Sequence, residues 1–314
     1  MEPVATRDAY GQALKKLGED FQDIVVLDAD LSKSTKTADF AKAFPKRFFD
    51  MGIAEQNMMT TAAGLAVSGK VVFASSFAIF ATGRAFEQVR NSIAYAQLNV
   101  KICATHAGIT VGEDGASHQA IEDIAIMRAI PNMRVVVPAD GPSTLKAVEA
   151  LYHTSGPFYL RLGRSKVSAV YDENVEFVPG QANILREGKD VGILACGLMV
   201  QEALRAADIL DQKGIKAAVV DVHTIKPLDK DTIINVAQMT GCLVTAEEHS
   251  IIGGLGGAVC ELVAANFPVP VERVGVEDIF GQSGSPEELM KYYGLTAENI
   301  VVRAEKTMVK KSIK

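Results

Sequence analysis

Residues 105–119, the substrate loop, hold the densest group of side chains suited to acid–base chemistry. His106, Asp114 and His118 lie in this loop, and glycines separate them. Imidazole groups donate hydrogen bonds and exchange protons near neutral pH, and a carboxylate accepts a hydrogen bond from a hydroxyl group. Glycine allows the backbone to bend sharply and to approach a ligand. The loop therefore predicts a site for a hydroxylated substrate, with a polar loop around a structural histidine as the alternative.

Glu55 is a second candidate, because it begins a run of helix-forming and small residues that continues to Ala66. A carboxylate in the first turn of a helix is stabilised by the helix dipole. Removal from water instead favours the protonated carboxyl group. A carboxyl group held between these two influences can share a proton with a ligand nitrogen. The alternative is a solvated first-turn glutamate.

Two aromatic residues and a set of cationic residues complete the candidates. Phe77 and Phe80 are three positions apart, so a helical turn would place both rings on one side, as a stacking surface for a flat heteroaromatic ring or as ordinary core. Arginine forks match phosphate oxygens. The residues that we expect to gather an anion, unless they are only surface groups, are Arg7, Ser34, Arg161 and Arg164.

The elements that must position these residues alternate between short β-branched runs and segments of helical period, as in a parallel sheet with crossing helices. In the first half we expect strands at 24–27, 71–74, 100–104, 135–137 and 158–160, and helices at 6–18, 54–67, 84–97, 119–129 and 142–152. Functional residues of such sheets lie at the carboxyl ends of the strands. Polar segments follow four of these strands, so we expect them to meet at one sheet edge.

The second half repeats the alternation. Its expected strands are 191–195, 217–222, 242–246 and 271–275, with helices at 198–210 and 297–309. Residues 165–188 are prone to turns and carry little periodicity. The sequence therefore predicts an α/β protein of two consecutive α/β domains, each with a mostly parallel sheet flanked by helices. We expect the domains at 1–170 and 189–314, joined by a linker at 171–188.

Composition excludes several classes of function. The 314 residues carry a net charge of -6, which disfavours nucleic acid as a partner. No apolar run reaches the roughly 18–20 residues of a membrane span, and the first residues lack the apolar core of a secretory signal. The four cysteines are widely spaced and are expected to be thiols. We therefore expect a cytoplasmic protein that binds neither membranes nor nucleic acid and that has no metal ligands of its own.

Three motifs together resemble the thiamine-diphosphate enzymes of the transketolase family. They are Asp28-Ala29-Asp30-Leu31, Gly52-Ile53-Ala54-Glu55 and Gly112-Glu113-Asp114-Gly115-Ala116-Ser117-His118-Gln119, and they occur in that order. The resemblance covers essentially the whole chain and matches the carboxyl-terminal half of a transketolase. It implies a pyrimidine-binding domain followed by the C-terminal domain of the family.

The resemblance also implies a role for each candidate residue. Glu55 would bond to N1′ of the aminopyrimidine and activate the cofactor, and His118 would exchange protons with the substrate; these two are the expected catalytic residues. The expected cofactor-binding residues are Asp30, Leu31, Glu55, Phe77 and Phe80. The expected substrate-binding residues are Arg7, Ser34, His106, Asp114, His118 and Arg164. The implied reaction is ketol transfer between sugar phosphates, as in the pentose phosphate pathway.

The diphosphate-binding half of the family has no counterpart here, because the chain contains no Gly-Asp-Gly motif with a following asparagine. The resemblance therefore implies a separate N-terminal transketolase subunit that supplies the ligands of Mg²⁺ or Ca²⁺, in an α2β2 assembly with a homodimeric core. Gly83 and Ala107 stand where many members have a tyrosine and an aspartate, which leaves the preferred sugar open.

Other functions remain open. Within the same cofactor class, the chain would be similar to a 1-deoxyxylulose-5-phosphate synthase or to the β subunit of a 2-oxoacid dehydrogenase, both of which use a 2-oxo acid as donor. A non-catalytic binding module with this fold is a further alternative. A nucleotide-binding α/β enzyme is disfavoured, because the glycine run at 253–257 does not have the Gly-x-Gly-x-x-Gly spacing.

Overall fold

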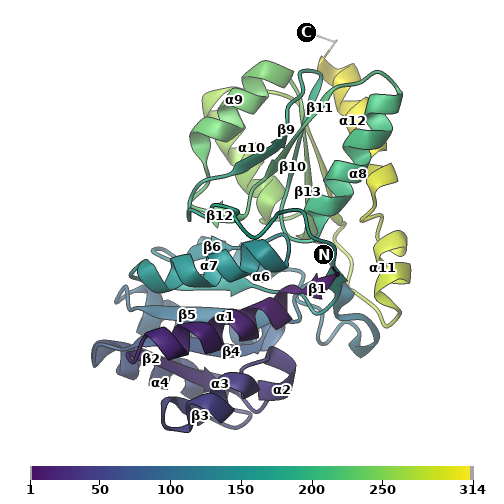
Figure 1. Ribbon diagram of the computed structural model, residues 1–314. Coiled ribbons are helices and arrows are strands. Elements are labelled where there is room, and N and C mark those ends of the chain that lie inside the picture. The colour runs from purple at the N-terminus through teal and green to yellow at the C-terminus, as the bar shows by residue number, and fades with distance from the viewer. Residues whose placement is uncertain (1, 312–314) are drawn as a thin grey trace.

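The computed structural model describes residues 2–311, which form two α/β domains stacked one on the other (Figure 1). The first domain contains the purple to teal part of the chain and the second contains the green and yellow part. Both sheets are mostly parallel and are flanked by helices, so the predicted fold class is confirmed. The amino-terminal end lies at the junction of the two domains, and the carboxyl-terminal helix extends away from it (Figure 1).

The first sheet has seven strands in the order β12-β6-β7-β5-β4-β2-β3. All neighbouring pairs are parallel except β12 with β6. Its strands from the first half of the chain are β2 (Ile24–Asp28), β3 (Phe48–Asp50), β4 (Val71–Phe77), β5 (Val100–Thr105), β6 (Arg134–Val136) and β7 (Phe158–Arg161). Strands β2, β4, β5 and β7 are buried along their whole length, as expected for continuous apolar runs covered on both faces.

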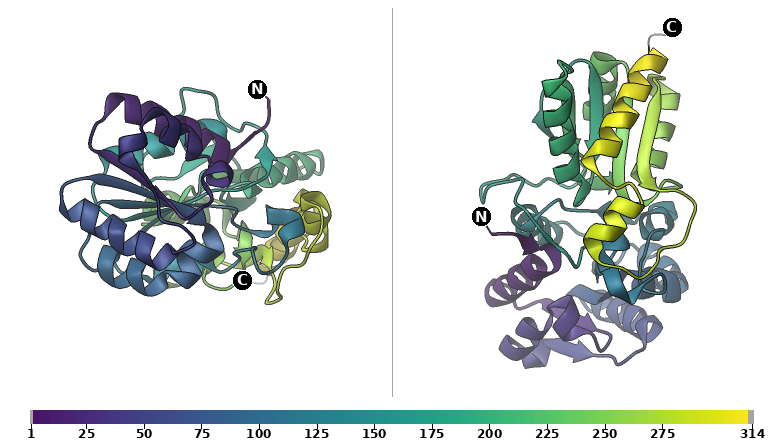
Figure 2. Two further views of the ribbon diagram at one scale, coloured as in Figure 1. Left: turned by 90° about the horizontal axis from the view of Figure 1, so that it is seen from below. Right: turned by 90° about the vertical axis from the view of Figure 1, so that its right-hand side faces the viewer.

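Helices cover both faces of this sheet (Figure 2). The longer ones are α1 (Thr6–Asp20), α4 (Glu55–Val67), α6 (Asp123–Ala129) and α7 (Gly141–His153). The shorter segments are α2 (Ser32–Thr35), α3 (Ala38–Ala43), η1 (Pro45–Arg47), η2 (Phe80–Arg84), α5 (Phe86–Gln88), η3 (Val89–Ala94) and η4 (Ile109–Asp114). Helix α7 begins where its sequence predicts, because Asp140 and Ser143 form a capping box around Pro142.

The second sheet has five strands in the order β14-β13-β10-β11-β9. They are β9 (Asn183–Arg186), β10 (Val191–Ala195), β11 (Ala217–Asp221), β13 (Leu243–Ser250) and β14 (Val271–Val276). The accompanying helices are α8 (Met199–Gln212), α9 (Lys230–Thr240), α10 (Leu255–Asn266), α11 (Pro286–Tyr292) and α12 (Ala297–Lys311). Figure 2 shows α11 beside the first domain, below the second sheet.

Several strands connect the two domains or lie in the segment between them. Strand β12 (Thr224–Lys226) follows β11 of the second sheet but pairs with β6 at the edge of the first sheet. Strand β1 (Val4–Ala5) pairs with β8 (Lys166–Val167), which follows β7 in the sequence. Strand β9 lies within the predicted linker and is the antiparallel edge strand of the second sheet. These short strands carry too little apolar periodicity to be predicted from sequence.

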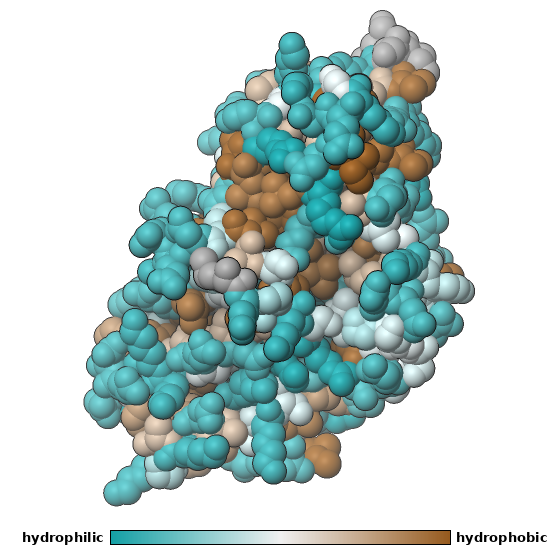
Figure 3. All heavy atoms as spheres, turned by 45° about the vertical axis from the view of Figure 1, so that its right-hand side comes forward, coloured by the Kyte–Doolittle hydropathy of each residue, from teal (hydrophilic) through white to brown (hydrophobic). Residues whose placement is uncertain are grey.

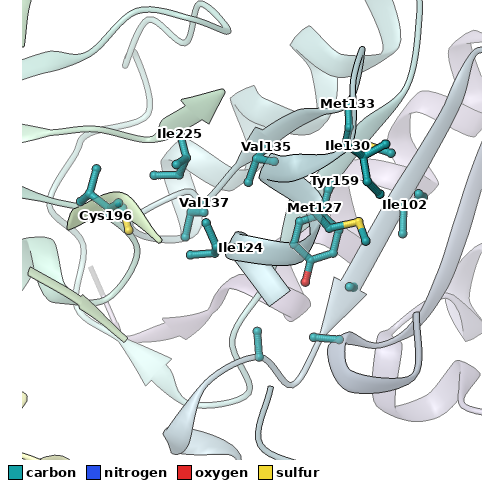
Figure 4. Packing of buried hydrophobic residues seen from close by; sticks show 14 of the residues in the cluster. Ile102, Ile124, Met127, Ile130, Met133, Val135, Val137, Tyr159, Cys196 and Ile225 are labelled. Carbon is teal, nitrogen blue, oxygen red and sulfur yellow. The ribbon is translucent and has the colours of Figure 1, made fainter. Parts of the chain in front are cut away.

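The hydrophobic core is continuous across the junction (Figure 4). Ile124 and Val137 of the first domain and Cys196 and Ile225 of the second belong to one buried cluster. Hydrophilic residues cover most of the face in Figure 3, where hydrophobic surface is concentrated in the upper half. The two domains therefore form a single packed unit.

A buried arginine joins this unit electrostatically. Arg161 is 5% exposed, and its Nε lies 2.7 Å from Oδ2 of the fully buried Asp123. Its Nη2 also donates to Oδ1 of Asp123 at 3.1 Å and to the carbonyl oxygen of Glu248, in the second domain, at 2.9 Å. Burial raises the pKa of Asp123, but the charge and hydrogen bonds of Arg161 outweigh it and hold this pKa below its ordinary value.

We predict that Asp123→Ala lowers the free energy of unfolding by about 3–5 kcal/mol, because the substitution removes the carboxylate that is hydrogen-bonded to the buried Arg161 charge. Urea denaturation of both proteins measures this difference. Glu149→Ala is the control, since it breaks an exposed ion pair with Lys146 (3.8 Å) and should cost less than about 1 kcal/mol. Equal losses in the two variants would contradict the role given to Arg161.

Candidate functional site

The loop after β2 is shaped by Asp28, a buried carboxylate at the end of that strand. Its Oδ1 accepts from the backbone N–H of Leu31 at 2.6 Å, and its Oδ2 accepts from the hydroxyls of Thr35 (2.6 Å) and Thr37 (2.9 Å). These three bonds fix the path of residues 28–37. The consequence is that the short helix α2 stands at the carboxyl edge of the sheet.

Arg7, Ser34 and His106 come together at this edge, as expected. Nη1 of Arg7 donates to the carbonyl oxygen of Ser34 and lies 3.1 Å from Nε2 of His106. Nδ1 of His106 lies 2.8 Å from Oγ1 of Thr105, so both ring nitrogens have partners. Burial, and next the positive charges of Arg7 and Arg164, lower the pKa of His106 to about 3. His106 is therefore neutral at physiological pH.

Four rings form the wall of the site above the end of β4. Phe77 stacks on His106 with ring centroids 3.8 Å apart, and Phe77 and Phe80 lie 6.0 Å apart with an interplanar angle of 16°. His118 meets the edge of Phe80 at 5.4 Å. The predicted aromatic pair and the predicted histidines therefore belong to one cluster rather than to separate parts of the molecule.

Glu55 is 1% exposed at the first position of α4, so the solvated alternative is excluded. It is not free, however. Nη1 of Arg84 donates to both of its carboxylate oxygens, at 3.0 and 2.9 Å. The guanidinium group of Arg84 also lies over the ring of Phe80, 4.5 Å from the centroid. A ligand nitrogen that bonds to Glu55 must share the carboxylate with Arg84 or displace it.

Arg164 organises the far side of the site. Its Nη1 donates to the carbonyl oxygen of Val111 and lies 3.5 Å from Oδ2 of Asp114 and 3.6 Å from Oε2 of Glu113. Asp114 itself is exposed. Arg164 thus holds the substrate loop. The pKa of the Arg7 guanidinium is lowered mainly by burial, and the positive charge of Arg164 lowers it further.

The remaining predicted residues lie at the rim or elsewhere. Asp30 is exposed with a φ of 62°, and its backbone N–H donates to Asp50. Leu31 is half-buried and caps α2. Arg161, expected to help gather an anion, is instead buried in its ion pair with Asp123. The cationic cluster is therefore Arg7 and Arg164, with the neutral His106 beside Arg7. The strand pattern places Arg161 at the sheet edge, but its inward direction depends on the tertiary structure.

Sequence reasoning missed Arg84, and it placed Asp28 in a motif without predicting that Asp28 would order the loop through Thr35 and Thr37. Arg84 follows Phe80 by four positions, a helical spacing that places a cation over a ring and would have indicated the contact.

Within residues 2–311 no group of three or more histidine, cysteine, aspartate or glutamate side chains is placed to hold a metal ion. No helix of that range combines the length and apolar character that crossing a bilayer requires.

This arrangement offers a flat aromatic wall beside a buried carboxylate, a neighbouring cationic cluster, and an acid and a histidine on a glycine-rich loop. Such a set can bind a flat heteroaromatic ring through stacking and one carboxylate bond. The cations suit an anionic group, and Asp114 with His118 suits hydroxyl groups.

Family models match almost the whole chain. The transketolase pyrimidine-binding domain matches residues 2–169, and the transketolase C-terminal domain matches residues 180–300. A protein of Methanocaldococcus jannaschii described as a transketolase C-terminal section is 53% identical over 97% of this chain and 96% of its own length. The 6-deoxy-6-sulfo-D-fructose transketolase subunit of a Clostridium species is 44% identical over 98% of this chain and 96% of its own length.

Solved structures agree with these matches. A split-gene transketolase, described as an inactive β4 tetramer, superimposes with a TM-score of 0.91 and 54% identity, over 99% of this chain and all of that chain.

Among the sequence relatives, human transketolase is 40% identical over 95% of this chain, but the match covers 48% of its length. The chain thus spans about half of this longer relative.

We predict that His106 stays neutral down to about pH 4, because its folded-state pKa of about 3 lies below the ordinary value of 6.5. Between these two values the unfolded chain takes up a proton that the folded chain does not, so the free energy of unfolding falls as the pH falls from 6.5 toward 3. Imidazole NMR titration measures the pKa, and Arg7→Met should raise it. Titration of His106 near pH 6.5 would contradict the assigned geometry.

Proposed function

The chain belongs to the transketolase family, and we propose that it is the C-terminal subunit of a thiamine-diphosphate-dependent transketolase. The proposed reaction transfers a two-carbon ketol unit between sugar phosphates, as in the pentose phosphate pathway, and requires an N-terminal partner subunit. The observation that carries the proposal is the buried Glu55 carboxylate, whose partner Arg84 lies over the ring of Phe80 next to Phe77, at the same sheet edge as the cationic cluster.

The residues fit the pyrimidine end of the cofactor. The nearly parallel rings of Phe77 and Phe80 would wall an aminopyrimidine, and Glu55 would hold its N1′ nitrogen. Asp30 and Leu31 would line the rim. When bound, thiamine diphosphate supplies the electron-rich carbon that breaks and forms the carbon–carbon bond. The protein's part is to hold the ring and to fix the position of the proton shared at Glu55.

The cationic and polar residues would bind the sugar phosphate. Arg7 and Arg164 present guanidinium groups suited to a phosphate, with the Ser34 backbone and neutral His106 fixing the direction of Arg7. Asp114 and His118 project from the substrate loop and would bind the hydroxyl and carbonyl groups. His118 would also exchange protons with the substrate there.

A second polypeptide would complete the site. This chain corresponds to about half of human transketolase and offers no described metal cluster, so the diphosphate and its Mg²⁺ or Ca²⁺ would be held by the N-terminal subunit. We expect an α2β2 assembly whose core is a dimer of this chain.

The preferred sugar stays open, because the relatives include subunits named for a sulfonated fructose and for apulose 4-phosphate. A 1-deoxyxylulose-5-phosphate synthase-like or 2-oxoacid dehydrogenase-like activity would consume pyruvate without transferring ketol units. A non-catalytic module would not need Glu55, Asp114 and His118 together. The cytoplasmic location stays a prediction from the cysteine spacing.

The direct test mixes this chain with a candidate N-terminal subunit, thiamine diphosphate and magnesium, and assays ketol transfer from xylulose 5-phosphate to ribose 5-phosphate. We expect activity only in the mixture, because neither half alone can hold both ends of the cofactor. Full activity of this chain alone would refute the split-subunit proposal. Pyruvate consumption without ketol transfer would favour the alternative activities.

Glu55→Gln serves as the matched variant in this assay. The amide keeps the size of the side chain but cannot accept the proton-sharing bond as a carboxylate does, so turnover should fall by at least about 100-fold. The circular dichroism spectrum should remain that of the folded chain. Near-normal turnover with cofactor bound would remove Glu55 from the catalytic role.

Arg164→Ala tests the phosphate site. The variant should lower kcat/KM for a phosphorylated ketose by roughly 10- to 100-fold, the factor that corresponds to a lost charged hydrogen bond of about 1.5–3 kcal/mol. An unphosphorylated ketose should be affected much less, and the comparison of the two substrates is the measurement. Equal losses for both would show that Arg164 holds the loop but not the phosphate.

A further inference from the structure

The substrate loop belongs to the first domain, yet the second domain holds it from two sides. Oε1 of Glu248, on β13, accepts from the backbone N–H of Thr110 at 2.6 Å. Residues 277–285, the strap, run between β14 and α11 and lie along the other side of the loop. The hydroxyl of Ser283 in the strap donates to the carbonyl oxygen of Glu113, next to Asp114.

Gln119 links the strap to the interior of the loop. Its side chain is 2% exposed, and Nε2 donates to the carbonyl oxygens of Ile109 (3.1 Å) and of Gln282 in the strap (3.0 Å). A third carbonyl oxygen, that of Gly112, lies 3.4 Å away. One buried amide, which follows the exposed Asp114 in the sequence, therefore connects the start and the interior of η4 to the second domain.

The strap approaches this amide so closely that a side chain at Gly281 would force the amide to move. A Cβ atom at Gly281 would lie 1.8 Å from Oε1 of Gln119 and 3.2 Å from Ile109. The loop also presents glycines to the strap, since a Cβ at Gly112 would lie 3.4 Å from the carbonyl oxygen of Gly284 and one at Gly115 would lie 3.5 Å from the backbone nitrogen of Ser283. The contact is thus built from backbone against backbone, with the Gln119 amide between them.

The loop needs such support, because its own structure is irregular. Segment η4 contains a non-helical residue, Gly112, with a φ of 85°, and Gly108 and Gly115 also have positive φ values. Glycine is the residue that loses most conformational freedom on ordering. A glycine-rich loop that carries Asp114 and His118 keeps one conformation only if packed neighbours fix it.

From these contacts we propose that the second domain sets the conformation of the substrate loop, with Gln119 as the positioning residue and the strap as its support. Gln119 acts on the substrate through Asp114 and His118 and does not touch it. This role extends the proposed function. The effect of Gln119 on sugar binding rests on that function, whereas its effect on the conformation of the loop does not. The second domain is then part of the active site's framework, although its residues carry no chemistry there.

Hydrogen–deuterium exchange of the free chain, followed by mass spectrometry, tests the proposal without partner or cofactor. Gln119→Met fills a similar space but cannot donate a hydrogen bond. We expect peptides that cover 108–119 to exchange about five- to tenfold faster, the factor that corresponds to a lost hydrogen bond of about 1–1.4 kcal/mol. Peptides from β4 and β10 should be unchanged. If the loop of the Gln119→Met variant exchanged at the same rate as the loop of the wild type, the proposal would be overturned.

Gln282→Met is the matched control. Gln282 is exposed and contributes its backbone carbonyl oxygen to the contact, so the same change of side chain should leave loop exchange as in the wild type. Loop exchange that increases equally in the control would show a general loosening of the strap rather than a role for Gln119, and would also overturn the proposal.

Gly281→Ala provides an independent test through crowding. The added methyl group should push the Gln119 amide away and speed hydrogen exchange in the loop. In the double variant Gly281→Ala/Gln119→Ala the methyl group has free space, so the loop should exchange no faster than in Gln119→Ala alone. Additive effects would contradict the contact.

In the reconstituted complex, Gln119→Met should raise KM for the ketose more than it lowers kcat. Absence of ketol transfer in the wild-type complex would refute the proposed function and leave the exchange test intact.

Discussion

The ion pair of Arg161 with Asp123 is the interaction on which the arrangement of the molecule depends. A guanidinium group at 5% exposure is stable only with a counterion and a full set of acceptors. Asp123 supplies the negative charge, and the carbonyl oxygens of Ala120 and Glu248 accept hydrogen bonds from Nη2 of Arg161. These partners come from the residue that follows the substrate loop, from the start of α6 and from the second domain. The requirement to satisfy one buried charge thus fixes three segments relative to one another.

The candidate site shows the same principle on a smaller scale. Asp28 orders the loop that carries Ser34 because three donors surround its buried carboxylate. Arg84 neutralises Glu55, whose burial without a partner would be costly. His106 takes the hydrogen bond of Arg7 in its neutral form. Each functional group therefore has its direction set by a partner before any ligand is present, which is the preorganisation that binding and catalysis use.

Two sheets, rather than one, shape the region where substrate would bind. The strand β12 crosses to the first sheet, and the shared core passes from Ile124 to Cys196 (Figure 4). The strap and Glu248 reach the substrate loop from the second domain. This organisation explains how a loop rich in glycine can hold an acid and a histidine at a defined place.

The sequence by itself determined the alternating α/β plan, because continuous apolar runs such as Val71–Phe77 have few other places than a buried parallel strand. It also determined that Ser34, Phe77, His106 and Arg164 meet, since the carboxyl ends of parallel strands share one edge. Only the tertiary structure decided that Arg161 faces inward, that Arg84 reaches Glu55, and that Gln119 meets the strap. These contacts join residues 29 to 163 positions apart, and side-chain direction at such distances depends on packing rather than on local periodicity.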